Sequence, residues 1–294
     1  MTDLNRLARP SGGLAMVAMD QRESLRTMFA EDTGAPATDE ELTRFKLAVA
    51  GELGPLASGF LIDRTYGYDA VVDRKLLPAG CGLILAADAL VHPPGGGPVV
   101  DTRLDDAIDP AEAAGRGAVA LKLLVLWRPD TRDQVLAMAE TFVRRCAAAG
   151  LLSVLEGVVP PGQDGQPAGA EFDEEVVTAA AALGGLRPSL YKCQMPRLGV
   201  GEPAELAAVC ARITSAVPVP WVVLSQGVSI ADFPTAVEIA CDAGASGFLA
   251  GRAIWRDTLT DPARLLRERS VERLGRLAGI VDSTARPWQE ALAG

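Results

Sequence analysis

The chain has 294 residues, of which 49% are hydrophobic and 22% are charged, a composition typical of a globular protein with a large core. Its 28 basic and 38 acidic side chains give a net charge of -10, which argues against partners such as nucleic acid or an anionic membrane surface. The first residues show no signal peptide, and no apolar run reaches the ~18 residues that a membrane span requires. Five cysteines without Cys-x-x-Cys spacing are expected to be free, buried thiols, so we expect a cytoplasmic protein.

Short apolar runs recur along the chain, each bounded by turn residues. Eight of them predict strands: Leu14–Asp20, Gly59–Asp63, Gly82–Ala87, Val119–Trp127, Leu151–Glu156, Ser189–Gln194, Trp221–Ser225 and Gly247–Ala250. Because these runs are apolar almost throughout, rather than at every second position, we expect strands that are buried on both faces, as in a parallel sheet.

Apolar residues at helical spacing occupy the intervals between these runs. They predict helices over Asp39–Leu53, Thr131–Ala149, Phe172–Leu183, Glu202–Ile213 and Ala231–Ala243. Strand and helix alternate in about eight units over ~250 residues, which predicts an α/β fold of the (β/α)8 barrel (TIM barrel) type. A doubly wound open sheet is the alternative, because a count of strands does not show closure.

The last part of the chain has a different pattern. After Thr258 the alternation stops, and Asp261–Arg269 and Val271–Ala278 predict terminal helices. We therefore expect one (β/α)8 domain over residues 1–294, with residues 259–294 as a C-terminal helical extension packed on the barrel.

Two loops are rich in Pro and Gly. His92–Pro98 follows the third predicted strand, and Pro160–Pro167 follows the fifth. Both are expected on the face where barrel active sites form, either as surface insertions or as lids.

Charged residues interrupt the predicted strands near their carboxyl ends, where the polar side chains of a barrel converge. These residues are Asp20, Lys122, Glu156 and Lys192. Such charges must pair when they are buried, and pairing also tunes the acid and base groups of active sites. For each residue alone, a supporting ion pair is the alternative. Asp63, at the end of the second strand, is equally well explained as a loop cap.

Lys192 lies in the middle of its short apolar strand. Apolar surroundings disfavour the ammonium form of a lysine and free the amine to attack a carbonyl. A lysine that snorkels to solvent or pairs with a carboxylate is the alternative. The three other charges at strand ends favour the catalytic interpretation.

The last two strands are followed by small residues and an arginine, in Ser225-Gln226-Gly227 and Ala250-Gly251-Arg252. Small residues let backbone amides approach an anion, and Arg252 adds a positive charge, so a phosphate site is predicted there.

The sequence lacks the residues that several other kinds of catalytic or binding site require. The single histidine, His92, lies in a Pro/Gly loop, which argues against a multi-histidine zinc site and against a Ser-His-Asp triad. No Gly-x-x-x-x-Gly-Lys-Ser/Thr motif for a nucleoside triphosphate occurs. Carbonyl chemistry by a lysine remains, without a metal or redox cofactor.

Motifs over nearly the whole chain resemble one family. They are Ser11–Gly13, Ala18–Glu23, Ala120–Arg128, Gly150–Ser153, Leu190–Lys192, Met195–Pro196 and Ala243–Ala253. The chain is similar to class I aldolases of the tagatose-1,6-bisphosphate aldolase type, and among them to the bacterial sulfofructosephosphate aldolases. The resemblance implies a homo-oligomer and a barrel whose strand-six lysine, here Lys192, forms a Schiff base with a phosphosugar.

The resemblance also implies roles for other residues. Glu156 would be the general acid and base, while Lys122 and Asp20 would orient the reacting groups. The residues expected to bind substrate are Gln21, Arg22, Ser225, Gly227, Gly251 and Arg252.

The chain departs from the family pattern at two positions. Gln194 replaces the glutamate of the expected Val-Glu-Met-Pro motif, so that a neutral amide shares a strand face with Lys192. Gln226 replaces the second serine of Ser-Ser-Gly, and its longer side chain would narrow the anion pocket.

The expected reaction is reversible cleavage of 6-deoxy-6-sulfofructose 1-phosphate to dihydroxyacetone phosphate and sulfolactaldehyde. Tagatose or fructose 1,6-bisphosphate is the alternative substrate. The candidates for binding the second anion are Arg22, Arg64, Arg128 and Arg197. An alternative of another class is a non-catalytic barrel that binds a phosphosugar.

Overall fold

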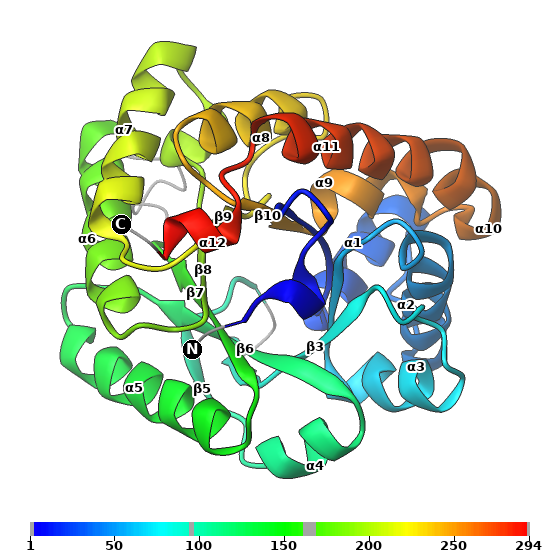
Figure 1. The fold of residues 1–294 in the computed structure, drawn as a ribbon. Coiled ribbons are helices and arrows are strands. Elements are labelled where there is room, and N and C mark those ends of the chain that lie inside the picture. Colours follow the sequence, from blue (N-terminus) through cyan, green and yellow to red (C-terminus); the bar gives the residue numbers. More distant parts are fainter. Residues whose placement is uncertain (1–2, 94–96, 161–168, 293–294) are drawn as a thin grey trace.

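The computed structural model describes residues 3–93, 97–160 and 169–292, in which eight parallel strands form a closed barrel (Figure 1). Their order around the barrel is β1, β10, β9, β8, β7, β6, β3 and β2. The bounds are β1 Leu14–Met19, β2 Gly59–Ile62, β3 Gly82–Ala86, β6 Ala118–Leu126, β7 Leu152–Val158, β8 Leu190–Cys193, β9 Trp221–Val223 and β10 Gly247–Ala250. The predicted (β/α)8 barrel is confirmed, and the open sheet is wrong because β1 pairs with both β2 and β10.

A ring of helices surrounds the strands in Figure 1. The helices are α1 Glu23–Thr33, α2 Asp39–Leu53, α3 Asp69–Asp73, α4 Pro110–Gly115, α5 Arg132–Ala148, α6 Gly169–Gly185, α7 Pro203–Ala216, α8 Phe233–Asp242, α9 Arg252–Trp255, α10 Pro262–Leu265, α11 Val271–Thr284 and α12 Trp288–Ala291. Short 3-10 or π segments are η1 Asn5–Leu7, η2 Arg64–Tyr68, η3 Pro196–Gly199, η4 Arg256–Thr258 and η5 Leu266–Ser270. No helix among the described residues is long and apolar enough to cross a membrane.

Helix α2 shows why local sequence predicted its bounds. The Thr38 side chain accepts a hydrogen bond from the Glu41 backbone amide at 3.2 Å, and the Glu41 carboxylate accepts one from the Thr38 amide at 2.8 Å. This capping box satisfies two backbone donors that the helix itself leaves unpaired. The helix begins at Asp39, as predicted, and its apolar side chains Phe45 and Val49 pack into the core.

A two-stranded antiparallel sheet, absent from the sequence prediction, follows β3. Its strands are β4 Asp88–Val91 and β5 Asp101–Leu104, with Asp88 opposite Leu104. Each strand has only four residues, too few for a clear period-2 pattern. The predicted Pro/Gly loop from His92 to Pro98 joins these two strands. Its residues 94–96, and residues 161–168 of the second loop, lie outside the described residues, so the lid interpretation is untested.

Inward-facing side chains of the strands fill the lower part of the barrel. Leu61, Ile84, Val154, Leu190 and Val222 belong to one buried apolar cluster there. On β7 and β8 the residues two positions further toward the carboxyl ends are Glu156 and Lys192, because every second side chain of a strand faces the same side. An apolar core therefore lies directly below a charged layer.

The carboxyl-terminal residues form helices along the outside of the barrel. Helix α11 lies beside α8 in Figure 1, and its residues Leu274, Leu277 and Val281 are buried in the main core. Trp288 of α12 instead joins the apolar cluster inside the barrel, next to Leu4 and Leu7 of the amino-terminal segment.

Candidate active site

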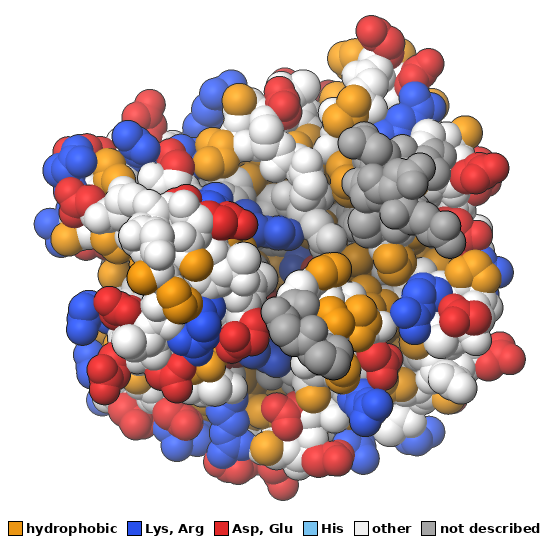
Figure 2. Space-filling model, turned by 180° about the vertical axis from the view of Figure 1, so that it is seen from behind, with side chains coloured by type: hydrophobic (Ala, Val, Ile, Leu, Met, Phe, Trp, Pro, Cys, Tyr) orange, Lys and Arg blue, Asp and Glu red, His pale blue; other side chains and the backbone are white. Residues whose placement is uncertain are grey.

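A cavity of about 590 Å³ opens at the carboxyl ends of the barrel strands. Figure 2 looks onto this face of the molecule, where the surface is hollowed and basic side chains lie within the hollow. The cavity is lined by residues that follow or end β1, β6, β7, β8, β9 and β10. It therefore lies where the active sites of (β/α)8 enzymes form.

The four charged residues predicted from the strand ends meet in this cavity. The Lys192 amine lies 2.9 Å from Oε1 of Glu156, and the other oxygen of Glu156 lies 2.7 Å from the Lys122 amine. Lys122 also lies 2.8 Å from Oδ2 of Asp20. Every one of these residues is at most 9% exposed. Glu156 thus links the two lysines inside a barrel that excludes most of the solvent.

The strand register explains this meeting. Glu156 and Lys192 are direct partners in the parallel β7–β8 pair, and Lys122 lies on β6, the next strand along. A residue pair in register on neighbouring strands has side chains that project to the same face. The sequence separations of 34 residues between Lys122 and Glu156 and 36 between Glu156 and Lys192 are therefore bridged by backbone pairing rather than by flexible loops.

A fifth charged residue, Asp88, belongs to the same layer, and the sequence reasoning missed it. Its Oδ2 lies 3.0 Å from the Lys122 amine and accepts a hydrogen bond from the Leu124 amide at 3.1 Å. Its Oδ1 accepts one from Arg22 at 2.9 Å, and Arg22 also donates to the Asp88 backbone carbonyl. The signal in the sequence was an aspartate two residues after inward-facing Ala86, directly beyond an apolar run.

Mutual charge holds Asp20 and Lys122 in their ionised forms. Burial alone would raise the pKa of Asp20, but the positive charges of Lys122 and Lys192 outweigh it and hold that pKa well below its usual range. Burial alone would lower the pKa of Lys122, but Asp20, Asp88 and Glu156 raise it well above its usual value. Lys122 is therefore a fixed cation among three carboxylates.

Oε2 of Glu156 accepts no hydrogen bond within the described part of the chain, although it lies close to Lys122. Oε2 contacts the Lys122 amine and Oε1 contacts the Lys192 amine. Both contacts are ion pairs whose angles fall outside hydrogen-bond geometry. The carboxylate is thus held in place by the charges of the two lysines.

A second buried ion pair lies behind the site. The Lys46 amine contacts Asp63 and donates to the backbone carbonyls of Met19, at 2.8 Å, and Gln21, at 2.6 Å. These carbonyls stand on either side of Asp20, so Lys46 fixes the backbone that carries this aspartate. Asp63 also accepts a hydrogen bond from the Tyr66 amide at 2.9 Å, which agrees with its predicted capping role.

The predicted anion site lies at the β9 and β10 side of the cavity. Ser225, Gly251, Arg252 and Gln21 all line it, together with Gln226. Burial lowers the pKa of Arg252, and Glu156 and Asp20 only partly oppose this effect. Among the described residues Arg252 forms no ion pair, so its guanidinium is available for an anion.

Glycine is required at position 251 by close approach. A Cβ atom there would lie 2.5 Å from the carbonyl oxygen of Ala18 on the neighbouring strand. Ser225 accepts a hydrogen bond from the Gly251 amide at 3.4 Å. Gln21 lies beside Gly251, and its Oε1 is buried without a hydrogen-bond partner within the described ranges.

Two residues predicted to bind substrate lie outside the cavity lining. Arg22 is committed to Asp88, as described above, and supports the charged layer from behind. Gly227 is exposed, has a φ of 81°, and would place a Cβ 2.7 Å from Leu198. A glycine is required at position 227 because most other residues disfavour this left-handed backbone conformation and because Leu198 leaves no room for a Cβ atom.

The other arginines that were candidates for binding the second anion of the substrate differ in whether they line the cavity. Arg197 pairs with Asp173 and Glu205, and Arg64 pairs with Glu112, so neither points into the cavity lining. Arg128 does line the cavity. It donates to the Val100 carbonyl at 3.0 Å.

The side chain of Gln194 forms hydrogen bonds with the backbone of Val159. Its Oε1 accepts a hydrogen bond from the Val159 amide at 2.7 Å, and its Nε2 donates to the Val159 carbonyl at 3.3 Å. A carboxylate could satisfy only the first of these contacts. The amide therefore holds the end of β7 and does not line the cavity around Lys192.

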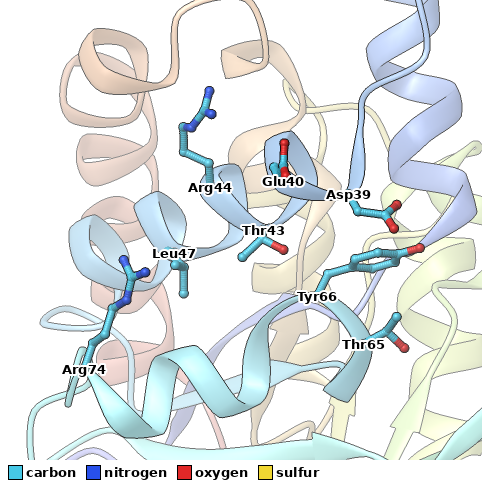
Figure 3. Close-up of a pocket in the computed structure, with 8 residues that line it drawn as sticks. All are labelled: Asp39, Glu40, Thr43, Arg44, Leu47, Thr65, Tyr66 and Arg74. Atoms are coloured by element: carbon cyan, nitrogen blue, oxygen red, sulfur yellow. The ribbon is translucent and has the colours of Figure 1, made fainter.

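A second hollow, of about 510 Å³, lies on the outside of the barrel between α2 and the segment after β2 (Figure 3). Its lining includes Asp39, Arg44, Tyr66 and Arg74. Arg44 and Arg74 are drawn at its edge, and none of the described residues that line it is a buried charged residue. The hollow at the strand ends is therefore the candidate active site.

The chain is similar to known aldolases. The sequence profile described as "DeoC/LacD family aldolase" matches residues 14–257. Tagatose 1,6-diphosphate aldolase 2 of Streptococcus agalactiae serotype III (strain NEM316) is 26% identical and aligns over 98% of this chain and 96% of its own length. Tagatose 1,6-diphosphate aldolase of Lactococcus lactis subsp. lactis is also 26% identical, over 98% of this chain and 96% of its own length.

Solved structures share the fold. A fructose-bisphosphate aldolase from Plasmodium falciparum has a TM-score of 0.72 at 15% identity and covers 96% of this chain and 93% of its own. An archaeal fructose-1,6-bisphosphate aldolase, solved with its catalytic Lys covalently bound to a carbinolamine intermediate, has a TM-score of 0.62 at 18% identity and covers 95% of this chain and 98% of its own.

Proposed function

Because the chain belongs to the DeoC/LacD family of aldolases, we propose that it cleaves a ketose 1-phosphate through a Schiff base on Lys192. The observation that carries this proposal is the 2.9 Å contact between the Lys192 amine and Glu156. Both groups lie in a buried layer above an apolar core, where an amine and a carboxylate can exchange protons with one bound molecule.

The first half of the reaction forms the imine. The unprotonated Lys192 amine attacks the ketone carbon, and the carbonyl oxygen takes up a proton to give a carbinolamine. Glu156, in its protonated form, gives a proton to the carbinolamine hydroxyl, and water leaves. The product is a protonated imine that can accept the electron pair of a breaking bond.

The second half breaks the carbon–carbon bond. The Glu156 carboxylate takes the proton of the hydroxyl group on the carbon beyond that bond. The electron pair of the bond moves into the imine to give an enamine, and the aldehyde leaves. Protonation of the enamine and hydrolysis of the imine then release dihydroxyacetone phosphate and restore Lys192.

Lys122 and Asp20 hold the geometry for these steps. Lys122 stays protonated among three carboxylates and orients Glu156, while Asp20 orients Lys122 from the other side. The phosphate of the substrate would lie against Arg252, with Ser225 and Gly251 beside it. A charge-assisted contact to a guanidinium is worth about 1.5–3 kcal/mol, enough to fix one end of a small substrate.

Two hexulose derivatives are candidate substrates. The sequence resemblance favours 6-deoxy-6-sulfofructose 1-phosphate, which would yield sulfolactaldehyde. The names of the aligned relatives favour tagatose 1,6-bisphosphate. Each carries a second anion at its far end, for which Arg128 is the rim arginine that lines the cavity.

Borohydride reduction in the presence of dihydroxyacetone phosphate tests the imine directly, because it converts the Schiff base to a stable amine. The chain has four lysines, so peptide mass analysis can assign the adduct. We expect the adduct on Lys192, its loss in Lys192→Met, and its retention in the matched control Lys75→Met, which removes an exposed lysine. Binding of phosphosugar without any adduct would instead favour a non-catalytic barrel.

A further inference from the structure

Lys46 reaches the site from outside the barrel. It belongs to helix α2, its side chain is fully buried, and it is not part of the described lining of the cavity. Its amine has three N–H donors, and three acceptors surround it: Asp63 and the backbone carbonyls of Met19, at 2.8 Å, and Gln21, at 2.6 Å. No donor remains for a bound molecule. Any influence of Lys46 on the reaction therefore passes through the groups that it contacts.

The two carbonyls stand on either side of a pair of residues that line the cavity. The Met19 carbonyl belongs to the peptide that precedes Asp20, and the Gln21 carbonyl belongs to the peptide that follows Gln21. Because each peptide unit is planar, one amine fixes the planes on both sides of Asp20 and Gln21. Both residues line the cavity, and Nε2 of Gln21 donates to Oδ1 of Asp20 at 3.2 Å.

Asp20 and Gln21 connect the charged layer to the phosphate end of the cavity. Oδ2 of Asp20 lies 2.8 Å from the amine of Lys122, which in turn contacts Glu156 at 2.7 Å. Gln21 lies beside Gly251, where a Cβ atom would come within 3.2 Å of its Nε2. A shift of this short segment would therefore move groups at both ends of the site. Misplacement by about 1 Å can lower a catalytic rate on the order of 10²-fold.

Stability alone is a weak reason to bury the Lys46–Asp63 ion pair. Both side chains are fully buried. The loss of water from two charges offsets most of their attraction, and apolar side chains of similar volume often replace such a pair without loss of stability. Burial lowers the pKa of Lys46, and the charges of Asp63 and Asp20 oppose this only in part. What an apolar pair could not replace is the pair of hydrogen bonds to the backbone.

From these contacts we propose that Lys46 is a positioning residue of the aldolase reaction, which holds Asp20 and Gln21 in place through two backbone carbonyls. The inference rests on the proposed Schiff-base reaction and adds to it a residue outside the cavity lining. Asp63 then compensates the charge of Lys46 and has no separate part in the reaction. Activity should consequently follow the lysine donors, whereas stability should follow the pairing of the two charges.

The test measures exchange of hydrogen between dihydroxyacetone phosphate and D2O by proton NMR. The imine on Lys192 loses a proton from the carbon next to the imine carbon to give an enamine, and a deuteron from the solvent then takes its place. This exchange requires the imine and the catalytic groups but no aldehyde, so it does not depend on the identity of the second product. The kcat and KM of exchange are measured for each variant, and urea denaturation measures its stability.

The double variant Lys46→Met/Asp63→Asn removes both charges and keeps an oxygen for the Tyr66 amide. We expect its urea midpoint to lie closer to that of the wild type than the midpoint of Lys46→Met does, because no charge is left buried alone. The kcat of exchange should nevertheless stay about 10–100-fold below that of the wild type, with KM changed much less, because the two carbonyls have lost their donor. A folded double variant with a kcat within about threefold of the wild type overturns the inference.

Asp63→Asn alone is the matched control. Its Nδ2 can donate to a neutral Lys46 amine, which keeps two N–H donors for the carbonyls of Met19 and Gln21. We expect a kcat of exchange within about threefold of the wild type, although the urea midpoint falls. A loss of kcat as large as that of the double variant would mean that activity follows the ion pair, and would refute the role proposed for the lysine donors.

Trapping separates this inference from the proposed function. Wild-type protein that gives neither a Lys192 adduct with borohydride nor exchange overturns the Schiff-base reaction, and this inference with it. An adduct and exchange in the wild type, together with a fully active double variant, overturn the role of Lys46 alone.

Discussion

The amine of Lys192 lies 2.9 Å from Oε1 of Glu156, and the two residues are direct partners across the parallel β7–β8 pair. Backbone register rather than a loop therefore sets the distance between the proposed nucleophile and its proton carrier. A strand pair in the middle of a closed barrel moves little, so the two groups are positioned before any substrate binds.

Glu156→Gln tests the proton carrier. The amide keeps the size of the side chain but cannot exchange a proton, and Lys122 keeps Asp20 and Asp88 as charge partners. We expect kcat to fall by about 10²–10⁴-fold, the usual contribution of general acid–base catalysis. Steady-state kinetics measure this change, and circular dichroism checks the fold. A kcat within threefold of the wild type would contradict the role assigned to Glu156.

Asp88→Asn tests positioning of Lys122. The asparagine would leave Lys122 with one fewer anion and would weaken the hold of Arg22. We expect kcat to fall by up to about 10²-fold, with KM changed much less, because misplaced catalytic groups lose rate rather than binding. The matched control is Asp101→Asn in the same hairpin, where the side chain is 45% exposed. Equal effects of the two substitutions would refute a positioning role.

Lys46→Met tests the buried ion pair behind the site. Lys46 and Asp63 are both fully buried, so the substitution leaves the Asp63 carboxylate without its cation. We expect the free energy of unfolding to fall by about 3–5 kcal/mol, measured by urea denaturation. The surface control Lys75→Met should change it by less than about 0.5 kcal/mol. Replacing Asp63 by Asn in the Lys46→Met background should restore part of the loss.

Asp20 makes a pH-dependent contribution to stability. The pKa of Asp20 lies below its usual range in the folded protein, although burial opposes this, because Lys122 and Lys192 favour the carboxylate. A depressed folded pKa stabilises the protein above the unfolded pKa of about 3.9, and this stabilisation is lost as the pH falls through the folded pKa. Urea denaturation at pH 7, 4 and 3 should show the stability difference between wild type and Asp20→Asn shrinking toward acid. A difference that grows toward acid would reverse the assigned sign.

Arg252→Gln tests the phosphate end. Loss of one charge-assisted contact of about 1.5–3 kcal/mol should raise KM for dihydroxyacetone phosphate by about 10–100-fold. The control is Arg256→Gln, one turn further on, whose guanidinium is occupied by Asp32 and Glu31 on the surface. It should leave KM within about twofold. Unchanged KM in Arg252→Gln would place the phosphate elsewhere.

Local sequence determined the repeating elements of this protein. The eight apolar runs coincide with the eight barrel strands, and the Thr38 cap marks the start of α2, because burial on both faces and helix capping act over a few residues. The same patterns placed Asp20, Lys122, Glu156 and Lys192 at strand ends, and the alternation of strand side chains then required them to face inward.

Tertiary structure alone decided which groups support this layer and what lies beyond it. Asp88 reaches Lys122 across 34 residues, and Lys46 reaches the backbone around Asp20 from a helix outside the barrel. Gln194 bonds to Val159, a contact that strand alternation could not indicate. Such contacts follow from barrel closure, which joins residues far apart in sequence and leaves no local pattern to read.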